Sequence, residues 1–414
     1  MASSSLNLTS RPIAALLTIG NELLSGRTVN TNASFLGRQL TALGFSVAKQ
    51  CVCPDSIKEI SGAMGQINSA DLLIVTGGLG PTPDDLTRDA IADYFSVPLK
   101  FSPEQFKALR IIYKKLGRNI PVLSKRETYY PANARPLINR FGIALGFWIQ
   151  DEKRLIVVLP GVPTELQKMF IHDVSPLLKR KFKGLRADKK IVASLVGISE
   201  PNIMEKLGKG FFDCPFQFGI YPSEGETQIC IRSESQAVLN DLKSKIKKRL
   251  DPWIYSWSDL PLALTIGDIL TRKKKTVAVA ESCTGGSLAH AWTQFAGASR
   301  FFRGGATVYD SEAKQAIGVP SSVIKKYGEV SPEVAFELAI QACRFWKSDY
   351  GMGVTGIAGP TGGSADKPIG LVYIAVACGG TAQVERHLFW GNREQIQRKS
   401  VVKSLEQLWR LLSL

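Results

Sequence analysis

Short apolar segments that run directly into glycine-rich turns are the feature that most constrains the fold of this 414-residue chain. Residues 71–76 and 277–280 are almost wholly apolar, as buried parallel strands are. Each segment is followed by a polar, glycine-rich turn and then by a stretch with helical character. Strands that alternate with helices at this spacing predict parallel, doubly wound α/β sheets.

The alternation occurs in both halves of the chain, and a chain of this length is expected to form two or three domains. We therefore predict an α/β protein with two doubly wound domains, residues 1–174 and 256–414, whose sheets are parallel or mixed. Residues 175–255 form a small α+β module between them, with a predicted hairpin of strands 216–221 and 227–232. We expect this module to orient the outer domains and to contribute to a homodimer contact.

The other predicted elements follow from apolar runs and helical spacing. The strands are expected at 13–19, 45–52, 71–76, 155–159, 191–196, 277–280, 304–309, 350–354 and 370–377. The helices are expected at 32–43, 57–69, 86–95, 164–170, 199–207, 235–250, 262–271, 287–295, 333–345 and 394–412, with a further helix beginning at residue 311. Residues 175–190 are basic and polar, and we interpret them as the exit from the first domain.

Composition and net charge indicate which kind of ligand and which cellular compartment to expect. The formal net charge of +16 suits a cationic enzyme with anionic substrates, and the basic stretches lack the interleaved aromatic residues of a nucleic-acid surface. The seven cysteines form no Cys-x-x-Cys pair, which indicates reduced thiols. Residues 1–11 lack the apolar core of a signal peptide, and no run is long enough to cross a membrane. We expect a cytoplasmic protein that binds nucleotides rather than nucleic acid.

The first candidate site is the turn after 277–280, where Ser282 lies between a strand and the start of a helix. Unpaired amides at a helix start favour anions, and the amides of Gly285 and Gly286 would lie close to an oxyanion or a phosphate. Ser282 is therefore a candidate nucleophile. Cys283 is its rival, because two adjacent side chains cannot both point at one substrate atom. An ordinary Gly-rich turn with an N-cap serine is the alternative interpretation.

A serine nucleophile needs a base, and none of the three histidines lies in a glycine-rich turn. Tyr309 ends a predicted strand and Lys314 follows one helical turn into the next helix, so both can face the same sheet edge. A lysine that is buried beside another cation, such as Arg393, can lose its proton near neutral pH. We predict that Lys314 is the base and that Tyr309 assists it. A surface lysine paired with Glu312 or Asp310 is the alternative.

The second candidate site is the turn 77–87, Gly-Gly-Leu-Gly-Pro-Thr-Pro-Asp-Asp-Leu-Thr. Its glycines let backbone amides approach an anion closely, and the helix that follows begins at the same place. The adjacent carboxylates of Asp84 and Asp85 suit a hydrated Mg²⁺ ion that bridges protein and pyrophosphate. Residues 356–363, which include Gly356 and Gly359, form another possible anion cradle.

Six segments of the C-terminal half resemble the CinA family: AESCTGG at 280–286, GASRFFRGGATVYDSEAK at 297–314, VSPEVA at 330–335, GVTGIAGPTGG at 353–363, KPIGLVYIA at 367–375 and GNREQIQR at 391–398. The resemblance implies a nicotinamide-nucleotide amidase, which converts nicotinamide mononucleotide to nicotinate mononucleotide and ammonia without a cofactor. It implies catalytic roles for Ser282, Tyr309 and Lys314. Substrate contacts are expected from Thr284, Gly285, Gly286, Thr355, Gly356, Gly359 and Arg393. The family's second late arginine is replaced by Gln397.

The N-terminal half resembles the molybdopterin-binding fold family in its CinA branch, through TIGNELLSGRTVNTN at 18–32, TGGLGPTPDDLTRDAIA at 76–92 and LPGVPTELQKMF at 159–170. This resemblance implies hydrolysis of the ADP-ribose pyrophosphate with a divalent metal such as Mg²⁺, held by Asp55 and Asp84. The other implied site residues are Glu22, Asn32, Thr76, Gly77, Gly78, Gly80, Pro81, Thr82 and Asp85. Two alternatives stay open. The N-terminal half could only bind a pterin or nucleotide and regulate the amidase, or the protein could be an accessory factor in DNA uptake.

Overall fold

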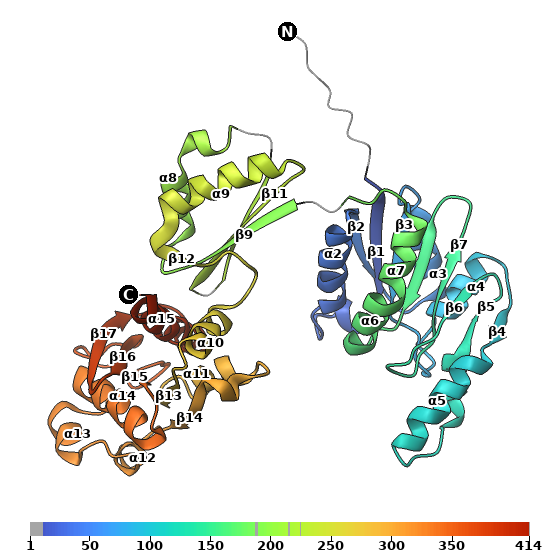
Figure 1. Ribbon diagram of the computed structural model, residues 1–414. Coiled ribbons are helices and arrows are strands. Elements are labelled where there is room, and N and C mark those ends of the chain that lie inside the picture. The colour runs from blue at the N-terminus through green and yellow to red at the C-terminus, as the bar shows by residue number, and fades with distance from the viewer. Residues whose placement is uncertain (1–10, 187–188, 214–215, 224, 414) are drawn as a thin grey trace, which may run out of the picture. The chain divides into compact units, whose positions relative to one another are not determined.

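The structure is a computed structural model that describes residues 11–186, 189–213, 216–223 and 225–413. It contains two compact units, unit 1 up to residue 188 and unit 2 from residue 189 to residue 414 (Figure 1). Residues 1–10, on which part of the signal-peptide argument rests, lie outside the described residues. The six described cysteines are free thiols: Cys51, Cys53, Cys230, Cys283, Cys343 and Cys378.

Unit 1 is built on a six-stranded mixed sheet with the strand order β2-β1-β3-β8-β7-β6. The first four strands are parallel, and β7 and β6 each run antiparallel to the preceding neighbour. The sheet strands are β1 (Ile13–Ile19), β2 (Ser46–Cys53), β3 (Leu72–Thr76), β6 (Arg135–Leu137), β7 (Gly146–Gln150) and β8 (Leu155–Leu159). A short pair, β4 (Leu99–Phe101) and β5 (Tyr129–Pro131), lies outside this sheet.

Helices cover both faces of this sheet, which explains why its central strands are apolar at nearly every position. In β3, Leu72 and Ile74 pack in one core, whereas Leu73 and Val75 pack in the other. The first core is covered by α2 (Thr31–Leu43), α6 (Pro163–Met169) and α7 (Ser175–Lys181), and the second by α3 (Ile57–Gln66) and α4 (Thr87–Tyr94) (Figure 1). The remaining helical segments are α1 (Asn21–Leu24), α5 (Pro103–Lys115), η1 (Val122–Thr128) and η2 (Phe170–Val174).

Unit 2 begins with a four-stranded antiparallel sheet in the order β10-β11-β9-β12. Its strands are β9 (Lys189–Val196), β10 (Gln217–Pro222), β11 (Glu226–Ser233) and β12 (Ile254–Ser256). Apolar side chains of α8 (Glu200–Leu207) and α9 (Gln236–Leu250) pack on it, and η3 (Lys209–Phe211) and η4 (Asp251–Trp253) complete the module. The predicted hairpin is confirmed by the pairing of β10 with β11.

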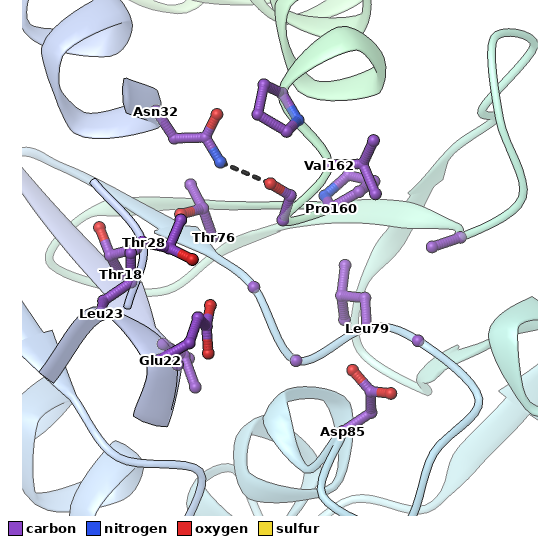
Figure 2. Close-up of a pocket in the computed structure, with 18 of the residues that line it drawn as sticks. Thr18, Glu22, Leu23, Thr28, Asn32, Thr76, Leu79, Asp85, Pro160 and Val162 are labelled. Atoms are coloured by element: carbon purple, nitrogen blue, oxygen red, sulfur yellow. Dashed lines mark hydrogen bonds between the residues drawn. The ribbon is translucent and has the colours of Figure 1, made fainter. Parts of the chain in front are cut away.

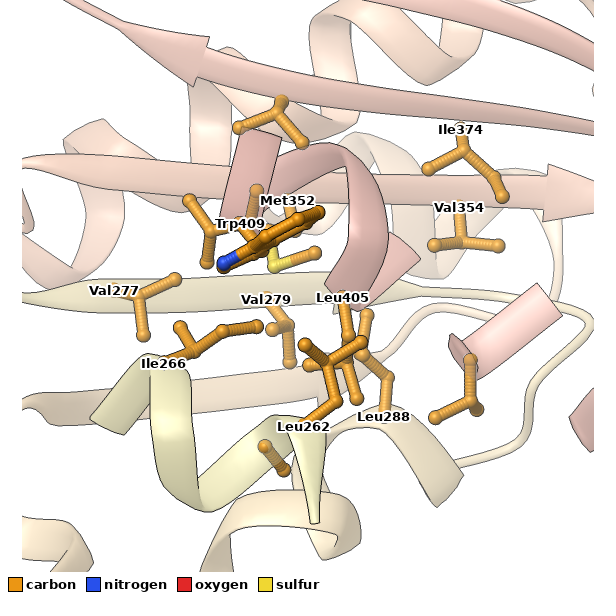
Figure 3. Close-up of a cluster of buried hydrophobic side chains, with 14 of the residues drawn as sticks. Leu262, Ile266, Val277, Val279, Leu288, Met352, Val354, Ile374, Leu405 and Trp409 are labelled. Atoms are coloured by element: carbon orange, nitrogen blue, oxygen red, sulfur yellow. The ribbon is translucent and has the colours of Figure 1, made fainter. Parts of the chain in front are cut away.

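The second sheet of unit 2 has the order β14-β13-β15-β16-β17, with β14, β13 and β15 parallel. Its strands are β13 (Val277–Glu281), β14 (Phe302–Thr307), β15 (Tyr350–Gly356), β16 (Leu371–Cys378) and β17 (Thr381–Leu388). Figure 3 shows the core between this sheet and α10 (Leu262–Arg272), α11 (Ser287–Thr293) and α15 (Arg393–Ser413). The other face is covered by α14 (Pro332–Trp346), with α12 (Ser311–Ala316), α13 (Ser321–Tyr327) and η5 (Ala298–Arg300) completing the fold.

The middle module and the last sheet share one apolar core. Val196 of β9 and Tyr255 of β12 are buried in the same cluster as Trp409 of α15. The Tyr255 and Trp409 rings lie edge to face with centroids 6.4 Å apart. This sharing is why residues 189–414 form one unit, whereas the sequence predicted a separate spacer. Helix α7 belongs to unit 1, because Leu177 and Leu178 are buried against its sheet.

The two α/β sheets confirm the predicted fold class, and most predicted elements are present within a few residues. The strand predicted at 304–309 lies instead at Phe302–Thr307, so Tyr309 is two residues beyond its end. Six strands of the described structure were not predicted from the sequence: β4, β5, β6, β7, β12 and β17. Strand β17 alternates exposed and half-buried residues at the sheet edge, and its polar composition hides the strand pattern.

Candidate functional site

The serine turn, residues 281–286, follows β13 at the carboxyl edge of the second sheet of unit 2. The Ser282 amide donates a 2.9 Å hydrogen bond to the Val354 carbonyl of β15, which fixes the turn against the neighbouring strand. The Ser282 side chain is 7% exposed. Gly285 and Gly286 have φ values of 62° and 94°, the left-handed region that favours glycine. The turn therefore needs both glycines to bring the chain into α11.

The Glu281 carboxylate caps the N-terminus of α11 from its buried side. This carboxylate accepts hydrogen bonds from the Thr284 hydroxyl at 2.7 Å and from the Leu288 and Ala289 amides at 3.0 Å. The predicted substrate contact Thr284 is fully buried, and its hydroxyl is committed to this carboxylate. Among the described residues, the Gly286 amide has no hydrogen-bond acceptor, whereas the Gly285 amide donates to the Ser282 carbonyl at 3.1 Å.

Cys283 points away from the sheet edge. It is 4% exposed and packs in the apolar core beneath the turn. Burial raises the pKa of its thiol to about 12, so the reactive thiolate is disfavoured at neutral pH. Its carbonyl accepts a 2.8 Å hydrogen bond from the Gln397 side chain, which ties the turn to α15. This environment favours Ser282 over Cys283 as the nucleophile.

Arg393, at the start of α15, joins two loops at the same sheet edge. One guanidinium nitrogen donates to the Tyr309 hydroxyl oxygen at 2.7 Å, and the other donates to the Gly359 carbonyl at 2.8 Å. Tyr309 is 56% exposed. Because its oxygen accepts from Arg393, its own hydroxyl hydrogen is available for another acceptor. Gly356 ends β15, and a Cβ atom there would lie 2.7 Å from the Leu371 carbonyl.

Lys314 is 1% exposed, and the groups around its ammonium are hydrogen-bond acceptors. The Nζ atom donates to the Tyr309 carbonyl at 3.0 Å and to the Asp310 carbonyl at 3.4 Å. It also lies 3.5 Å from a carboxylate oxygen of Glu329. The described structure places the Glu329 carboxylate beside Lys314, whereas we expected a neighbouring cation such as Arg393. In the described structure the Ser282 hydroxyl makes no hydrogen bond with Lys314 or Tyr309, so the base assignment stays a prediction.

Glu329 links several residues near Lys314, although it was not predicted from the sequence. The Ser311 hydroxyl donates to its carboxylate, and the buried Thr355 hydroxyl donates to its carbonyl at 2.7 Å. Thr355, an expected substrate contact, thus positions the segment that carries Glu329. No local pattern marks Glu329 in the sequence, because its partners come from two other segments, α12 and β15.

Unit 1 contains a cavity of about 470 Å³ at the carboxyl ends of β1, β3 and β8, called here the unit 1 cavity (Figure 2). Ten predicted residues line it: Glu22, Asn32, Asp55, Thr76, Gly77, Gly78, Gly80, Pro81, Asp84 and Asp85. Thr82 does not line it. The Thr82 hydroxyl and amide both donate to Asp85, at 2.5 Å and 2.9 Å, and so shape the loop.

Close packing and hydrogen bonds fix the conformation of the glycine-rich loop. A Cβ atom on Gly77 would lie 2.2 Å from the Ile19 carbonyl oxygen, and one on Gly78 would lie 2.1 Å from the Thr87 hydroxyl oxygen. Both glycines also have positive φ values, 99° and 63°. The buried guanidinium of Arg88 donates to the Leu79 carbonyl and to the Gly80 carbonyl at 3.2 Å. Arg88 was not predicted, because buried arginines have no sequence signature.

Three buried polar atoms at the unit 1 cavity lack a hydrogen-bond partner within the described residues. They are Asn32 Oδ1, Thr76 Oγ1 and Glu127 Oε2. The other end of the Asn32 amide donates to the Gly161 carbonyl at 2.7 Å, the dashed line in Figure 2. Buried polar groups are normally paired, so these atoms indicate a polar ligand.

Carboxylates dominate the charge of the unit 1 cavity. Six of its described lining residues are acidic, and none is Lys, Arg or His: Glu22, Asp55, Asp84, Asp85, Glu127 and Glu165. Burial raises the pKa of Asp55, and the charges of Glu22, Asp84 and Asp85 raise it further. A cation would relieve this repulsion. No three His, Cys, Asp or Glu residues of the described chain gather as a metal cluster, and the metal expected at Asp55 and Asp84 stays a prediction.

Each half of the chain matches a known protein family. Residues 15–180 match the probable molybdopterin binding domain, and residues 259–412 match the CinA C-terminal domain. A putative competence-damage inducible protein from Moorella thermoacetica is 37% identical over 401 residues, which cover 95% of this chain and 97% of that protein. One from Clostridium acetobutylicum is 34% identical over 396 residues, which cover 93% and 96%. The chain belongs to the CinA family.

Solved structures of CinA family proteins match part of the chain. A crystal structure of CinA from Thermoplasma acidophilum, with its function given as unknown, is 33% identical and covers 41% of this chain and 98% of that one, with a TM-score of 0.36. A competence/damage inducible protein from Agrobacterium tumefaciens is 34% identical and covers 38% and 99%, also with a TM-score of 0.36. In this member of the CinA family, none of the described helices has the length and apolarity to cross a bilayer.

Proposed function

We propose that unit 2 is an amidase that converts nicotinamide mononucleotide to nicotinate mononucleotide and ammonia. The observation that carries this proposal is Ser282, fixed between β13 and β15 with the unpaired Gly286 amide four residues on. A hydroxyl at a strand-to-helix turn next to a free amide suits nucleophilic attack on a carbonyl and stabilisation of the oxyanion. The resemblance of the surrounding motifs to nicotinamide-nucleotide amidases supplies the substrate.

In the proposed reaction, Ser282 Oγ adds to the carboxamide carbon, and the Gly286 amide donates to the oxygen that becomes negative. The serine proton passes through Tyr309 and Lys314 to the amide nitrogen, the C–N bond breaks, and ammonia leaves. Water then cleaves the serine ester, which releases the carboxylate product and restores Ser282. The hydrogen bond from Arg393 holds the Tyr309 hydroxyl oxygen for this proton transfer.

Release of ammonia from nicotinamide mononucleotide tests the proposal. We expect turnover by the full-length protein and its loss by several orders of magnitude in Ser282→Ala. Thr293→Ala, an exposed helix position, serves as a control that keeps full activity. If the wild-type protein releases no ammonia but binds DNA, the accessory role suggested by the competence names of its relatives is favoured instead.

For unit 1, we propose metal-dependent hydrolysis of the pyrophosphate bond of ADP-ribose. The acidic unit 1 cavity favours it, because a divalent ion would reduce the repulsion between the pyrophosphate and the six carboxylates. When bound between Asp55 and Asp84, a divalent ion would neutralise phosphate charge and polarise the attacking water. The glycine loop would contribute backbone amides to the phosphates.

The experiment is ADP-ribose turnover across a panel of divalent ions. Asp84→Asn is expected to lower metal-dependent turnover at least about tenfold and to leave ammonia release unchanged, since the two sites lie in separate units. Binding of ADP-ribose without cleavage at any metal concentration would favour a purely regulatory unit 1. An equal loss of both activities would contradict the assignment of independent sites.

A further inference from the structure

Glu127 is a buried carboxyl side chain in the wall of the unit 1 cavity. It lies in η1 (Val122–Thr128), is 5% exposed and lines the cavity. Its Oε2 atom has no hydrogen-bond partner within the described residues. The adjacent Arg126 does not neutralise it, because the Arg126 guanidinium is paired with Asp89 at 2.7 Å. A buried carboxyl oxygen that faces a cavity without a partner is available to a ligand.

The groups that face Glu127 come from several elements. Arg88 of α4 contributes positive charge, but its guanidinium donates to the carbonyls of Leu79, Gly80 and Arg126. Glu165 of α6 and Asp85 of the glycine-rich loop add negative charge, and the Ser124 hydroxyl donates a hydrogen bond. Burial has the largest effect and raises the pKa of Glu127 to about 7, with Glu165 and Asp85 acting in the same direction. Ser124 and Arg88 oppose this shift.

We infer that Glu127 selects phosphate-bearing ligands in its protonated form, so that binding of an anionic nucleotide to the unit 1 cavity takes up one proton at this side chain. The inference rests on the proposed nucleotide-binding function of unit 1. Glu127 is thus inferred to be a specificity-determining residue that the sequence motifs did not predict.

The charge of Glu127 determines whether ligand affinity rises or falls with pH. A carboxylate on Glu127 repels a phosphate in the same cavity, whereas the neutral acid can donate a hydrogen bond to a phosphate oxygen. The pKa of Glu127 is therefore higher in the complex than in the free protein. Affinity is greatest below the free value of about 7 and falls as the pH rises through it. For one proton, the loss is at most about tenfold per pH unit.

The neighbouring carboxyl Glu165 differs in a way that makes the inference specific. Its Oε2 atom already accepts a 2.6 Å hydrogen bond from the Asn139 amide, so it needs no partner from the ligand. Burial raises the pKa of Glu165 too, but this hydrogen bond lowers it. Glu127 is thus the acidic side chain of the cavity that is both deeply buried and incompletely paired.

Calorimetric titration with ADP-ribose tests the inference. Its pyrophosphate diester keeps the same charge between about pH 6 and about pH 8, so any proton taken up belongs to the protein. Titrations in chelator prevent turnover, and buffers with different ionisation enthalpies report the number of protons. We expect an uptake of up to one proton near pH 7.5 and an affinity that falls as the pH rises.

Glu127→Gln mimics the neutral acid, and we expect it to abolish the proton uptake and flatten the pH dependence while keeping the affinity of wild type at about pH 6. Glu59→Gln, an exposed acid outside the cavity, should behave as wild type. If Glu127→Gln does not fold, Glu127→Ala must remove the uptake instead. Adenosine, a neutral probe, should bind without proton uptake.

Wild-type binding that is independent of pH, or a proton uptake that persists in the Glu127 variants, overturns the inference. So does the absence of ADP-ribose binding at every pH, both in chelator and with Mg²⁺. These outcomes are distinct from failure of the proposed pyrophosphatase. That proposal fails when ADP-ribose binds with the expected proton uptake but is not cleaved with any divalent ion.

Discussion

At the scale of residues, the side chains that follow the parallel strands were predictable and their partners were not. Ser282 and Thr355 lie at one sheet edge because β13 and β15 are parallel neighbours, a consequence of strand order that the alternating pattern implies. Glu329, Arg88 and Glu127 reach their sites through long-range packing, which leaves no spacing in the sequence. The sequence therefore predicted candidate residues at the strand ends but not these three charged side chains.

The choice between two adjacent nucleophiles can be tested by paired variants. Cys283→Ala is expected to retain ammonia release within a few fold and to lower the free energy of unfolding by about 1 kcal/mol, because the thiol is buried in the core. Ser282→Ala should lose the activity with little change in stability. Steady-state rates and denaturant unfolding of both variants check this. The reverse pattern of activities would identify Cys283 as the nucleophile.

The role of Lys314 is tested by Lys314→Arg. Arginine keeps the positive charge near the Glu329 carboxylate but does not act as a base near neutral pH. If Lys314 removes the serine proton, the turnover number should fall by about 10²-fold or more, with a smaller change in the Michaelis constant. Circular dichroism and thermal unfolding verify the fold, since the side chain is buried. Near-normal turnover would show that the charge only positions the loop.

At the scale of elements, the buried parallel strands were predicted accurately because a short, wholly apolar run between turns is typical of a strand covered on both faces. Strand β8 was predicted with its observed bounds, Leu155–Leu159. Residues 175–190 were interpreted as the exit from the first domain and α7 was not predicted, since its basic residues conceal Leu177 and Leu178. Charged residues mark the exposed side of an amphipathic helix as readily as a linker, so composition alone did not distinguish the two.

The glycine-rich loop offers a prediction with a matched control. Gly77→Ala places a Cβ atom 2.2 Å from the Ile19 carbonyl oxygen at a positive φ, so we expect a cost of about 1–3 kcal/mol and weaker ADP-ribose binding. Gly62→Ala lies within α3, where a Cβ atom meets nothing within 4 Å. It should stabilise unit 1 by roughly 0.5–1 kcal/mol. Thermal unfolding and calorimetry compare the two; equal effects would contradict a special loop conformation.

At the scale of the whole molecule, the shared core of unit 2 predicts where the chain can be divided. A fragment of residues 189–414 keeps Val196 and Tyr255 against Trp409, whereas a fragment of residues 256–414 loses both. We expect the shorter fragment to be less stable by about 2–5 kcal/mol. Thermal unfolding of the two fragments measures the difference. Equal stability would favour the division at residue 255 that the sequence predicted.

The carboxylate of Glu281 carries a consequence for product release. It occupies the amides that begin α11, which would otherwise attract an anion. The proposed reaction turns a neutral carboxamide into a charged carboxylate beside that filled helix end. The product would thus gain a charge that the Leu288 and Ala289 amides cannot hold, because Glu281 already occupies both. In the proposed amidase, this arrangement would limit inhibition by the carboxylate product.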